Sequence, residues 1–574
     1  IHSNLAVYSL KAYAEKYGLN KHQIKIKEYT INQYPEEILS DIYSEKADVV
    51  GFSCYIWNIA LTKEVINDLK VVAPKTIVIV GGPEVSYNPR NVLMENPAID
   101  YVMCQEGEEL FKEFLDNYDN ELTDKNIKGL VYRQGNEIIE IPNTCPMDLS
   151  KVPFVYKDMK DFENKIIYYE TSRGCPFSCS YCLSSIDKRI RFRDIDIVKK
   201  ELQFFLDNNT AQVKFVDRTF NCNKNHAMEI WQYIKDHDNG ITNFHFEVAA
   251  DVLKDDEIEL ISDMRPGLIQ LEIGVQSTNI DTITEIHRKM DFKKVADIVT
   301  RINAGHNIHQ HLDLIAGLPY EDLESFKQSF QDVYEVHPEQ LQLGFLKVLK
   351  GSPMHRMAKE YGIQYHSKPP YEVLSTTWLP YEDVRTLKGI EEVVERYYNS
   401  LQFESSLRYL VEQEQDAFAF FEKLALFFTQ NGYFNVKQSR MQNYEILYAF
   451  AKKEQRNVDI VKELLIYDLY ARENVKKEPD FLENRILTEE KKEKLRAFYQ
   501  SEAQREKYLP DYPDYNWKQV MRMTHMEWFS YDIVQYLQDG ILYEKKTLVL
   551  FDYQKRNPLS YQAKVQIVRE QVTE

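Results

Sequence analysis

Two spacings of hydrophobic residues alternate along the first part of the chain. Segments with apolar residues every three or four positions predict helices, and the short β-branched runs between them predict buried strands. Helices are predicted at residues 2–18, 35–46 and 62–74, strands at 23–31, 47–55 and 76–82, and a strand followed by a helix at 99–115. Strands that alternate with helices are typical of a parallel sheet covered on both faces. The pattern also predicts one further strand ahead of residue 2, outside this sequence.

A second alternating region begins near residue 165, after a proline-containing connector with a predicted hairpin at 129–141. Helix-length segments separate its strands, and six consecutive β/α units predict a partial barrel. The strands are predicted at residues 166–174, 212–220, 243–251, 268–277, 309–319 and 340–349.

Beyond residue 366 the pattern changes to long amphipathic helices rich in Tyr, Phe and Glu, followed by a small β element at 540–568. Aromatic residues at helical spacing are typical of a packed core. The predicted fold class is therefore α/β, with a doubly wound, Rossmann-like N-terminal domain, a partial (β/α)6 TIM-type barrel and a mainly α-helical C-terminal domain. The predicted boundaries are 1–125 for the first domain, 126–164 for the connector, 165–365 for the barrel and 366–574 for the helical domain.

Charge and cysteine content narrow the possible functions. The formal net charge of −19 argues against nucleic acid as a partner, because phosphate binding needs clustered Lys and Arg. No stretch approaches the roughly 20 apolar residues of a membrane-spanning helix, and no charged-then-apolar leader opens the chain. The seven cysteines are odd in number and lack the spacing of a disulfide framework, which favours a reducing compartment. We therefore expect a cytoplasmic protein with no membrane partner.

Three of the cysteines, Cys175, Cys179 and Cys182, lie within eight residues and follow the first strand of the predicted barrel. A structural zinc site normally has four protein ligands, and no fourth Cys or His lies in this loop. A [4Fe–4S] cluster held by three thiolates leaves one iron open to a substrate or cofactor. The spacing favours such a cluster, and zinc or a coincidental grouping remains the alternative.

The strand ends of the first domain are a second candidate site. In doubly wound sheets ligands bind beyond the carboxyl ends of the strands, which here are followed by residues 51–58, 81–87 and 106–108. Gly81 and Gly82 would let a large ligand approach the backbone closely. An ordinary tight turn is the alternative interpretation of this Gly-Gly pair.

The cysteine motif "RGCPFSCSYC" (173–182), with Tyr181 before its last cysteine, resembles the signature of the radical S-adenosylmethionine (SAM) superfamily. Three further segments fall where that superfamily has them, at the ends of the second, fourth and fifth strands: "FVDRTFN" (215–221), "LEIGVQS" (271–277) and "LDLIAGLPYE" (312–321). The first domain, with "GFSCYIWN" and "IVIVGGPEVS" in order, resembles the cobalamin-binding domain of the cobalamin-dependent radical SAM subfamily. The resemblance covers residues 1–360, and the helical remainder resembles the extra domain of an uncharacterised branch.

The resemblance implies three cofactors: a [4Fe–4S] cluster, S-adenosyl-L-methionine and cobalamin. Cys175, Cys179 and Cys182 would ligate the cluster, and SAM would bind the open iron. Tyr181 would lie beside the adenine, with a core aromatic as the alternative. Glu272, Gln276 and Ser277 would surround the ribose and methionine portions of SAM. Arg288 would bind the SAM carboxylate, with an ordinary exposed helix arginine as the alternative.

For cobalamin, the resemblance implies two groups of residues. Ser53, Tyr55, Trp57 and Asn58 would line its lower face, and Gly81, Gly82, Pro83 and Glu84 would follow the corrin or its nucleotide tail. The D-x-H-x-x-G motif that supplies a cobalt-binding His in many cobalamin proteins is absent from this sequence. Cobalamin radical SAM enzymes often lack that imidazole, so its absence leaves the interpretation open.

The implied activity is reductive cleavage of SAM to a 5′-deoxyadenosyl radical, used for methyl transfer to an unactivated carbon. An external electron donor of flavodoxin or ferredoxin type is implied, while the substrate and the catalytic residues remain unassigned. Three alternatives stay open: radical rearrangement or cyclisation without methyl transfer, tRNA methylthiolation, and a non-catalytic iron–sulfur electron-transfer module. The methylthiolation family carries three cluster-binding cysteines in its first domain, whereas only Cys54 and Cys104 precede the connector here.

Overall fold

The computed structural model describes residues 2–118, 126–143, 145–476, 479–482 and 488–569. Residues 119–125, which contain the predicted end of the first domain, lie outside the described part. The chain forms two compact units: one contains Ile1–Ile308, Ile315–Phe326 and Gly344–Tyr381, and the other contains His309–Leu314, Lys327–Leu343 and Glu382–Glu574.

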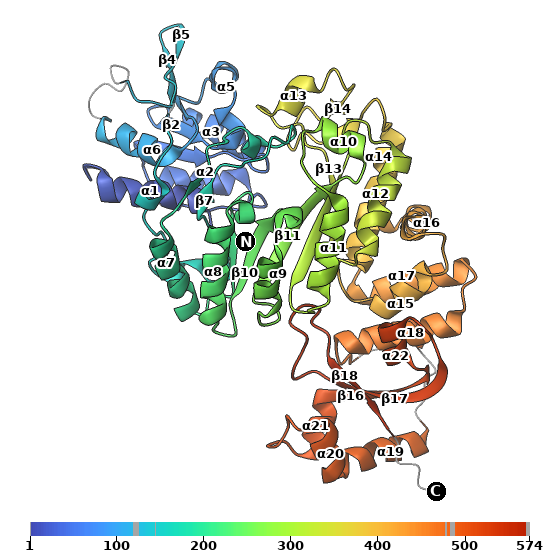
Figure 1. Cartoon of the computed structure of the whole chain (residues 1–574). Helices are drawn as coiled ribbons and strands as arrows, with labels where there is room; N and C mark the ends of the chain where they lie inside the picture. The colour runs from blue at the N-terminus through green and yellow to red at the C-terminus, as the bar shows by residue number, and fades with distance from the viewer. Residues whose placement is uncertain (1, 119–125, 144, 477–478, 483–487, 570–574) are drawn as a thin grey trace. The chain divides into compact units, whose positions relative to one another are not determined.

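The first sheet has the strand order β1-β2-β3-β4-β5. Its parallel strands are β1 (Val49–Ser53), β2 (Ile77–Gly81) and β3 (Tyr101–Met103), and the predicted hairpin, β4 (Leu130–Gln134) and β5 (Glu137–Glu140), extends the sheet beside β3 (Figure 1). The helices are α1 (Leu5–Tyr17), α2 (Pro35–Ser44), α3 (Ile59–Val72), α4 (Pro83–Ser86), α5 (Pro89–Glu95) and α6 (Gly107–Asp116). Val65, Ile66 and Leu69 of α3 pack in one core with Val78 and Val80 of β2. The predicted Rossmann-like α/β character is confirmed.

The strand predicted at residues 23–31 is wrong, because this segment forms no strand in the structure. Its side chains alternate between half-buried and exposed from His22 to Lys27, which explains the prediction. No described strand pairs with it, so its backbone lacks the ladder of hydrogen bonds that defines a strand. Lys25 and Lys27 instead form ion pairs with Glu45, just past the end of α2.

The second sheet has the order β6-β9-β10-β11-β12-β13. These strands occur where all six were predicted: β6 (Ile167–Tyr169), β9 (Gln212–Phe215), β10 (Asn243–Val248), β11 (Ile269–Gln276), β12 (His309–Ala316) and β13 (Gln340–Phe345). The pairs β6–β9, β9–β10 and β10–β11 are parallel. The helices α7 (Ile195–Asp207), α8 (Lys224–Asp236), α9 (Asp255–Ser262) and α11 (Phe292–Asn303) alternate with the strands along one face (Figure 1). The order has two ends, as expected of a partial barrel.

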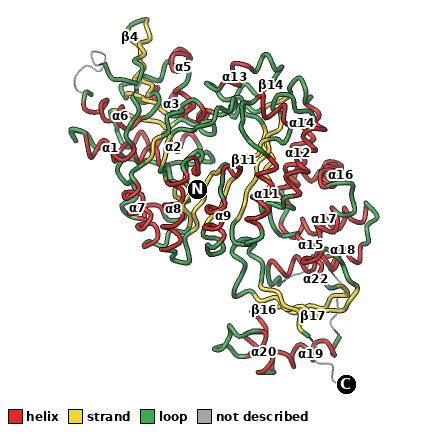
Figure 2. Tube along the Cα trace, in the orientation of Figure 1, coloured by secondary structure: helices red, strands yellow, loops and turns green. Residues whose placement is uncertain are grey.

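Helices dominate the chain after Tyr381, which confirms the predicted helical C-terminal region (Figure 2). The main helices are α14 (Tyr381–Tyr397), α15 (Glu404–Val411), α16 (Ala417–Gln430), α17 (Arg440–Lys453) and α18 (Val458–Arg472). The β element is an antiparallel sheet of β16 (Thr524–Tyr531), β17 (Glu544–Asp552) and β18 (Lys564–Val568). The sequence interpretation missed β16.

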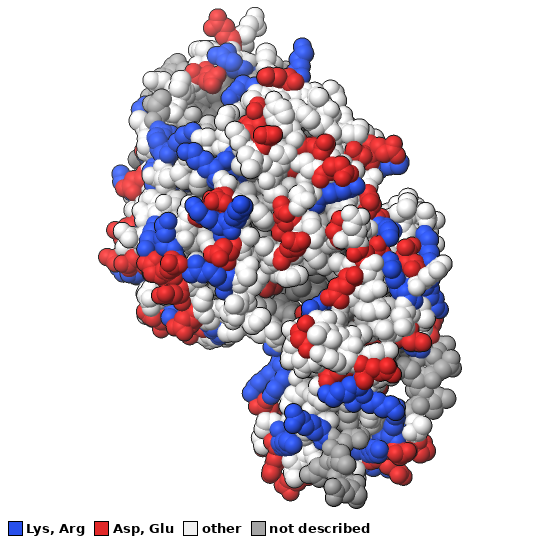
Figure 3. Space-filling view, turned by 45° about the vertical axis from the view of Figure 1, so that its right-hand side comes forward, with Lys and Arg blue, Asp and Glu red and all other residues white. Residues whose placement is uncertain are grey.

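Charged residues of both signs share the molecular surface. On the face drawn in Figure 3, basic and acidic side chains are interspersed. Within the described residues, no helix is both long and apolar enough to span a membrane.

A buried aspartate stabilises the start of α15 from a different helix. The residue before α15 is Phe403, whose side chain cannot accept a hydrogen bond from the free backbone N–H groups there. Asp468 of α18 does so instead. Its carboxylate accepts from the backbone N–H groups of Ser405 and Ser406 at 3.0 and 2.9 Å, and from their hydroxyls at 2.7 and 2.6 Å. Burial raises the pKa of Asp468 to about 6.

Replacing Asp468 with Ala is expected to lower the free energy of unfolding by roughly 3 kcal/mol, because buried donors lose a charged acceptor. Urea unfolding followed by circular dichroism measures this change. The matched control is Asp459→Ala on the exposed face of α18, expected to change stability by at most about 0.5 kcal/mol. Equal losses in the two variants would contradict a capping role for Asp468.

Candidate active site

The three cysteines lie on a loop enclosed by a short hairpin. Strands β7 (Ser172–Arg173) and β8 (Arg191–Phe192) pair antiparallel at its base. The N–H of Cys175 donates to the Asp187 carbonyl at 3.0 Å. Gly174 has φ +97°, and a Cβ there would lie 2.6 Å from the Arg189 carbonyl oxygen, so the close approach of the two chain segments requires glycine. The chain's own hydrogen bonds therefore shape the loop.

Further hydrogen bonds fix the second half of the loop. The Ser185 hydroxyl lies within hydrogen-bond distance of the carbonyl oxygens of Cys179 and Cys182, at 2.9 and 2.7 Å. Beneath the loop, the buried Asp217 carboxylate accepts from the hydroxyls of Thr171 and Ser172, both at 2.6 Å. Asp217, which follows β9 as the sequence predicted, thus holds the segment that leads into the cysteine motif.

The thiols lie among polar groups from other strands. Cys175 and Cys179 are buried and Cys182 is partly buried. Cys175 Sγ lies 3.7 Å from Thr219 Oγ1, and Cys179 Sγ lies 3.8 Å from Arg288 Nη1. Burial raises the pKa of Cys175, and the neighbouring Cys182 and Cys179 raise it further. Mutual repulsion of this kind is relieved when a metal centre binds the thiolates.

The spacing of the three sulfur atoms bears on the choice of metal. Four thiolates around one zinc, with Zn–S bonds of about 2.3 Å, lie roughly 3.8 Å apart in tetrahedral geometry. The Sγ atoms of the three cysteines, all within the described part of the chain, do not all lie within 4.8 Å of one another. The loop therefore fits a cluster, whose thiolates bind different irons, better than a single zinc ion.

Buried polar atoms without a hydrogen-bond partner surround the cysteine loop. They are Ser180 Oγ on the loop itself, Gln276 Oε1 at the end of β11, and Nε of Arg288. Gln276 has φ +73°, a strained conformation for a residue other than glycine. Since buried polar groups are normally satisfied, these three atoms fit a polar molecule such as SAM bound beside the cluster.

Arg288 and Tyr181 are both enclosed by this region. The Arg288 guanidinium donates to the Gly274 carbonyl, and its Nη1 lies 3.4 Å from the Tyr181 hydroxyl. Arg288 is partly buried, which argues against an ordinary exposed helix arginine. The contacts of both residues with SAM stay predictions.

Glu272 and Ser277 are already engaged by protein groups. The Ser277 hydroxyl donates to Glu321 Oε1 at 2.5 Å, which links the ends of the motifs at 271–277 and 312–321. Glu272 Oε2 lies 2.9 Å from Lys214 Nζ and 3.0 Å from His245 Nε2. Binding of SAM by Glu272 and Ser277 stays a prediction, and both side chains would have to share these partners with it.

Polar side chains line the inner face of the second sheet. Strand register places Tyr168, Lys214 and His245 side by side on β6, β9 and β10. Two residues further along β10, on the same face, Glu247 lies beside Glu272 of β11. The residues between them, such as Phe215 and Phe246, are fully buried on the opposite face. A barrel interior is usually filled by apolar side chains, so this polar face favours a site for a polar substrate. The sequence interpretation named Glu272 but missed Lys214 and His245.

The two carboxylates on this face differ in proton affinity. Burial opposes ionisation of Glu272, but the nearby His245 and Lys214 side chains lower its pKa to about 2. Burial raises the pKa of Glu247 to about 7, and the charge of Glu272 adds to this effect. No hydrogen bond to the Glu247 carboxylate occurs within the described residues.

This difference predicts a pH-dependent stability. Between pH 4.5 and about 7 the unfolded chain has released the Glu247 proton while the folded protein retains it, so the free energy of unfolding falls as pH rises through this window. Glu247→Gln removes the effect and is expected to gain roughly 1–3 kcal/mol over the unmodified protein between pH 5 and pH 8. Urea unfolding at both pH values measures it, with the exposed Glu259→Gln on α9 as control. A constant difference between the two proteins would contradict a raised pKa.

In the first domain, the loop after β1 presents an aromatic pair. Asn58 holds the loop, since its Oδ1 accepts from Tyr55 N–H and its Nδ2 donates to the Ser53 carbonyl, both at 2.8 Å. The rings of Tyr55 and Trp57 stack 4.5 Å apart with an interplanar angle of 8°. Trp57 is 62% exposed. A flat apolar surface at the carboxyl end of a parallel strand fits a flat macrocycle such as the corrin.

The loop after β2 packs against the loop after β1. Gly82 has φ +107°, and a Cβ there would lie 2.6 Å from the Cys54 carbonyl oxygen. Pro83 begins α4, and the Glu84 carboxylate accepts a hydrogen bond from the Tyr371 hydroxyl and lies 3.8 Å from Lys350. Gly82 therefore permits a contact between two protein loops. Contact of Gly81, Gly82, Pro83 and Glu84 with cobalamin stays a prediction.

The carboxyl ends of the first sheet meet the cysteine loop. After β3, Glu106 and Glu108 bind Arg173, which precedes Gly174 and Cys175, at 2.8 and 2.9 Å. After β2, Tyr87 packs against Gly351, whose added Cβ would lie 2.5 Å from Tyr87 Cβ. Burial raises the pKa of Tyr87, and the charge of nearby Cys182 contributes. The two candidate cofactor sites thus border each other.

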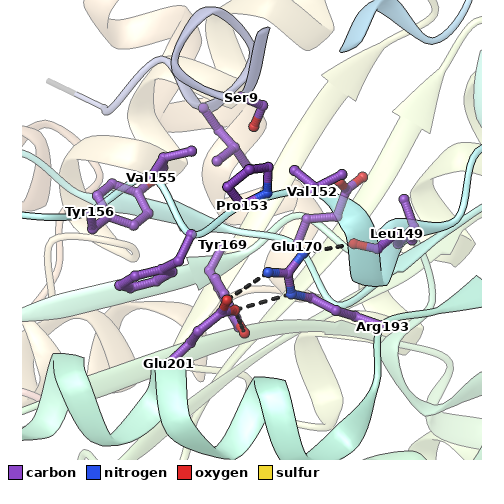
Figure 4. A pocket seen from close by; sticks show the side chains of 12 residues that line it. Ser9, Leu149, Val152, Pro153, Val155, Tyr156, Tyr169, Glu170, Arg193 and Glu201 are labelled. Atoms are coloured by element: carbon purple, nitrogen blue, oxygen red, sulfur yellow. Dashed lines mark hydrogen bonds and ion pairs between the residues drawn. The ribbon is translucent and has the colours of Figure 1, made fainter. Parts of the chain in front are cut away.

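A separate pocket lies between α1, the connector and the start of the second sheet (Figure 4). Its charged groups bind one another: Arg193 Nη2 lies 2.6 Å from Glu201 Oε1, and Arg193 Nη1 donates to the Leu149 carbonyl at 2.8 Å. The Tyr169 hydroxyl donates to Glu201 at 2.7 Å. These satisfied bonds indicate a structural role, and none of the predicted site residues lines this pocket.

Comparison with protein families matches three consecutive parts of the chain. Residues 1–115 match the B12 binding domain, residues 169–333 the Radical SAM superfamily, and residues 359–551 a family described as Protein of unknown function (DUF4080). The resemblance inferred from the sequence motifs is confirmed: a B12-binding domain precedes a radical SAM domain.

Individual relatives are similar over about half of this chain. The cobalamin-dependent radical SAM methyltransferase TokK of Streptomyces tokunonensis is 25% identical over 348 residues, which cover 56% of this chain and 50% of that protein. The anaerobic magnesium-protoporphyrin IX monomethyl ester cyclase of Synechocystis is 22% identical over 320 residues, which cover 54% of this chain and 64% of that protein. The chain thus spans only half the length of TokK.

Among solved structures, the radical SAM methyltransferase TsrM of Kitasatospora setae, with cobalamin and a [4Fe–4S] cluster bound, has a similar fold. The TM-score is 0.55 at 14% identity, with 65% of this chain and 76% of that chain covered.

Proposed function

We propose that this chain, which joins a B12-binding domain to a radical SAM domain, is a cobalamin-dependent radical SAM methyltransferase that methylates an unactivated carbon. The observation that carries the proposal is the meeting of the two candidate cofactor sites. Glu106 and Glu108 at the end of β3 bind Arg173, two residues before the first cysteine of the motif. A methyl carrier and a radical source are useful together only if they border one cavity.

The cofactors in this proposal are a [4Fe–4S] cluster, S-adenosyl-L-methionine and cobalamin. When bound, the cluster supplies the electron that cleaves SAM, and cobalamin supplies a methyl carrier. Cys175, Cys179 and Cys182 hold the cluster, and the unsatisfied atoms of Ser180, Gln276 and Arg288 bind SAM. Trp57 and Tyr55 support the corrin. The polar inner face around Lys214 and Glu247 binds the substrate, and the packed helices behind the sheet exclude water.

The test is anaerobic reconstitution with iron, sulfide and cobalamin, followed by assay with SAM that is labelled in its methyl group. We expect 5′-deoxyadenosine, S-adenosylhomocysteine and label on the bound cobalamin. Reconstituted protein that retained no cobalamin would show that the first domain is assigned wrongly. Protein that held the cluster but formed no 5′-deoxyadenosine would refute radical SAM chemistry.

A second candidate is a radical rearrangement or cyclisation without methyl transfer. The similarity to the magnesium-protoporphyrin cyclase of Synechocystis favours it, because that relative matches a similar share of this chain to the share that TokK matches. The same assay separates the two functions: the rearrangement predicts 5′-deoxyadenosine without label on cobalamin and without S-adenosylhomocysteine.

Methylthiolation is the weaker alternative. Its family carries three cluster-binding cysteines in the first domain, and the two cysteines that precede the connector here, Cys54 and Cys104, are both buried. The first domain of this chain therefore lacks the three cysteines that would bind the second cluster of such an enzyme.

A further inference from the structure

A pocket borders the cysteine loop on its solvent side. It is lined by Ser178, Ser185, Ile186, Lys188, Gly351, Pro353 and Arg356. Ser178 lies between Cys175 and Cys179 in the sequence and is exposed, whereas both of these thiols are buried. The loop therefore turns its sulfur atoms inward and its backbone toward solvent.

Two contacts hold the walls of this pocket against the loop. The Lys188 ammonium donates to the Ser178 hydroxyl at 2.6 Å. The backbone N–H of Met354, in α13 (Pro353–Met357), donates to the Ser180 carbonyl at 2.8 Å. The pocket thus borders the loop that carries the predicted cluster ligands, and these two contacts attach its walls to that loop.

The rim of the pocket carries exposed positive charge. Lys188 and Arg356 are exposed, and neither forms an ion pair within the described part of the chain. Lys359, one turn beyond Arg356, is also exposed. A rim with three exposed cations favours a negatively charged partner. Ile186, 45% exposed, adds an apolar surface between the cations.

We propose that this rim docks the acidic protein that reduces the cluster, a one-electron donor of flavodoxin type. The inference rests on the proposed function, which needs an electron from outside the chain. Electron transfer weakens steeply with distance, so the donor should approach the exposed side of the cysteine loop, where Ser178 and Lys188 lie at the surface. Carboxylates around a flavin complement Lys188 and Arg356, and the apolar flavin edge fits against Ile186 and Pro353.

The electron balance of the step is simple. The anionic flavin hydroquinone loses one electron and becomes the neutral semiquinone, while the oxidised [4Fe–4S]2+ cluster gains that electron and becomes [4Fe–4S]1+. No proton moves and no bond forms or breaks. The rim residues act only by attracting and orienting the donor, so their charges should affect the association rate most strongly.

The test compares two reductants on the reconstituted holoenzyme by stopped-flow absorbance. With pre-reduced flavodoxin at low salt, the cluster of the Lys188→Glu/Arg356→Glu variant is expected to be reduced at least 10-fold more slowly than the cluster of the unmodified protein. This difference in rate should shrink as the salt concentration rises. With dithionite, the two proteins should be reduced at the same rate. Calorimetric titration of the holoenzyme with flavodoxin should show the corresponding loss of affinity without any turnover.

The matched control, Lys200→Glu/Lys293→Glu, makes the same change in net charge on exposed positions of α7 and α11. It is expected to keep the rate and affinity of the unmodified protein. If the reversed pair fails to hold a full complement of iron, Lys188→Gln/Arg356→Gln replaces it, with an expected 3-fold or greater decrease.

Three results would overturn the proposal. The rim and control variants could be slowed equally by flavodoxin, the rim variant could keep the unmodified rate, or the charge dependence could appear with a ferredoxin and not with flavodoxin. Failure of the proposed function is distinguishable, because the unmodified holoenzyme would then form no 5′-deoxyadenosine even with dithionite.

Discussion

Alanine at Cys179 is expected to abolish cluster binding and SAM cleavage, whereas alanine at Cys222 is expected to preserve both. Cys179 is buried in the motif loop beside Arg288. Cys222 lies in the short helix η5 (Phe220–Cys222) after β9 and is half-buried. Burial, with the charges of Asp217 and Cys175, raises the pKa of Cys222 to about 11. Cys222 lies outside the three-cysteine motif, which supplies all the protein thiolates of a cluster with one open iron.

The comparison of the Cys179→Ala and Cys222→Ala variants decides whether the protein ligates three irons of the cluster and leaves one open, or ligates all four. Iron and sulfide analysis and the EPR spectrum of the reduced protein measure cluster binding, and 5′-deoxyadenosine formation measures SAM cleavage. We expect the Cys179 variant to fall to background in all three measurements. A Cys222→Ala variant that lost its cluster would identify a fourth thiolate ligand, and the iron would then have no free position for SAM.

The helices and strands could be predicted from the local sequence pattern, since each strand of the second sheet has apolar residues that face the helices. Val213 and Phe215 on β9 and Phe244 and Phe246 on β10 are fully buried. Periodicity of this kind is a local property, so all six strands were found. The segment at 23–31 has the same alternation but lacks a paired neighbour among the described residues, and the sequence pattern cannot reveal whether a partner exists.

The site residues could be predicted from the sequence where a motif is contiguous, as it is for the three cysteines. They could not be predicted where the site depends on pairing between residues that are distant in the sequence. Lys214 and Glu272 are 58 positions apart, and Arg173 and Glu106 are 67 apart. Nothing in the local composition specifies such partners. The signal that remained was weaker: polar residues at alternate positions of buried strands, which must find partners or a ligand.

A continuous set of ion pairs runs from the first domain to the first cysteine. Arg173 binds Glu106, Glu108 and Glu170 at 2.8, 2.9 and 2.7 Å. Arg191 binds both Glu106, at 2.6 Å, and the Asp187 carboxylate, at 2.9 Å, and the Asp187 carbonyl accepts from Cys175 N–H. Burial opposes the charge on Arg173, but the Glu170 and Glu108 carboxylates raise its pKa above its usual value.

Replacing Arg173 with Met is therefore expected to lower the free energy of unfolding by about 3 kcal/mol. The arginine side chain is 23% exposed, and among the described residues its loss leaves Glu108 and Glu170 without a cation and Glu106 with Arg191 alone. Because the same pairs hold the base of the cysteine loop, cluster loading should fall as well. Arg173→Lys should retain only part of the stability and of the cluster loading, since an ammonium group cannot reproduce the planar fork of hydrogen bonds that a guanidinium group makes.

The matched control is Arg189→Met in the same hairpin. Arg189 is exposed, and its ion pair with Asp187, at 3.1 Å, should contribute at most about 1 kcal/mol. Urea unfolding gives the stability of each variant, and iron content after reconstitution gives its cluster loading. If both methionine variants lost stability equally, or if Arg173→Met kept a full cluster, the contact between the first domain and the cysteine loop would not position the cluster. A selective loss at Arg173 would show that the B12-binding domain helps to shape the cysteine loop.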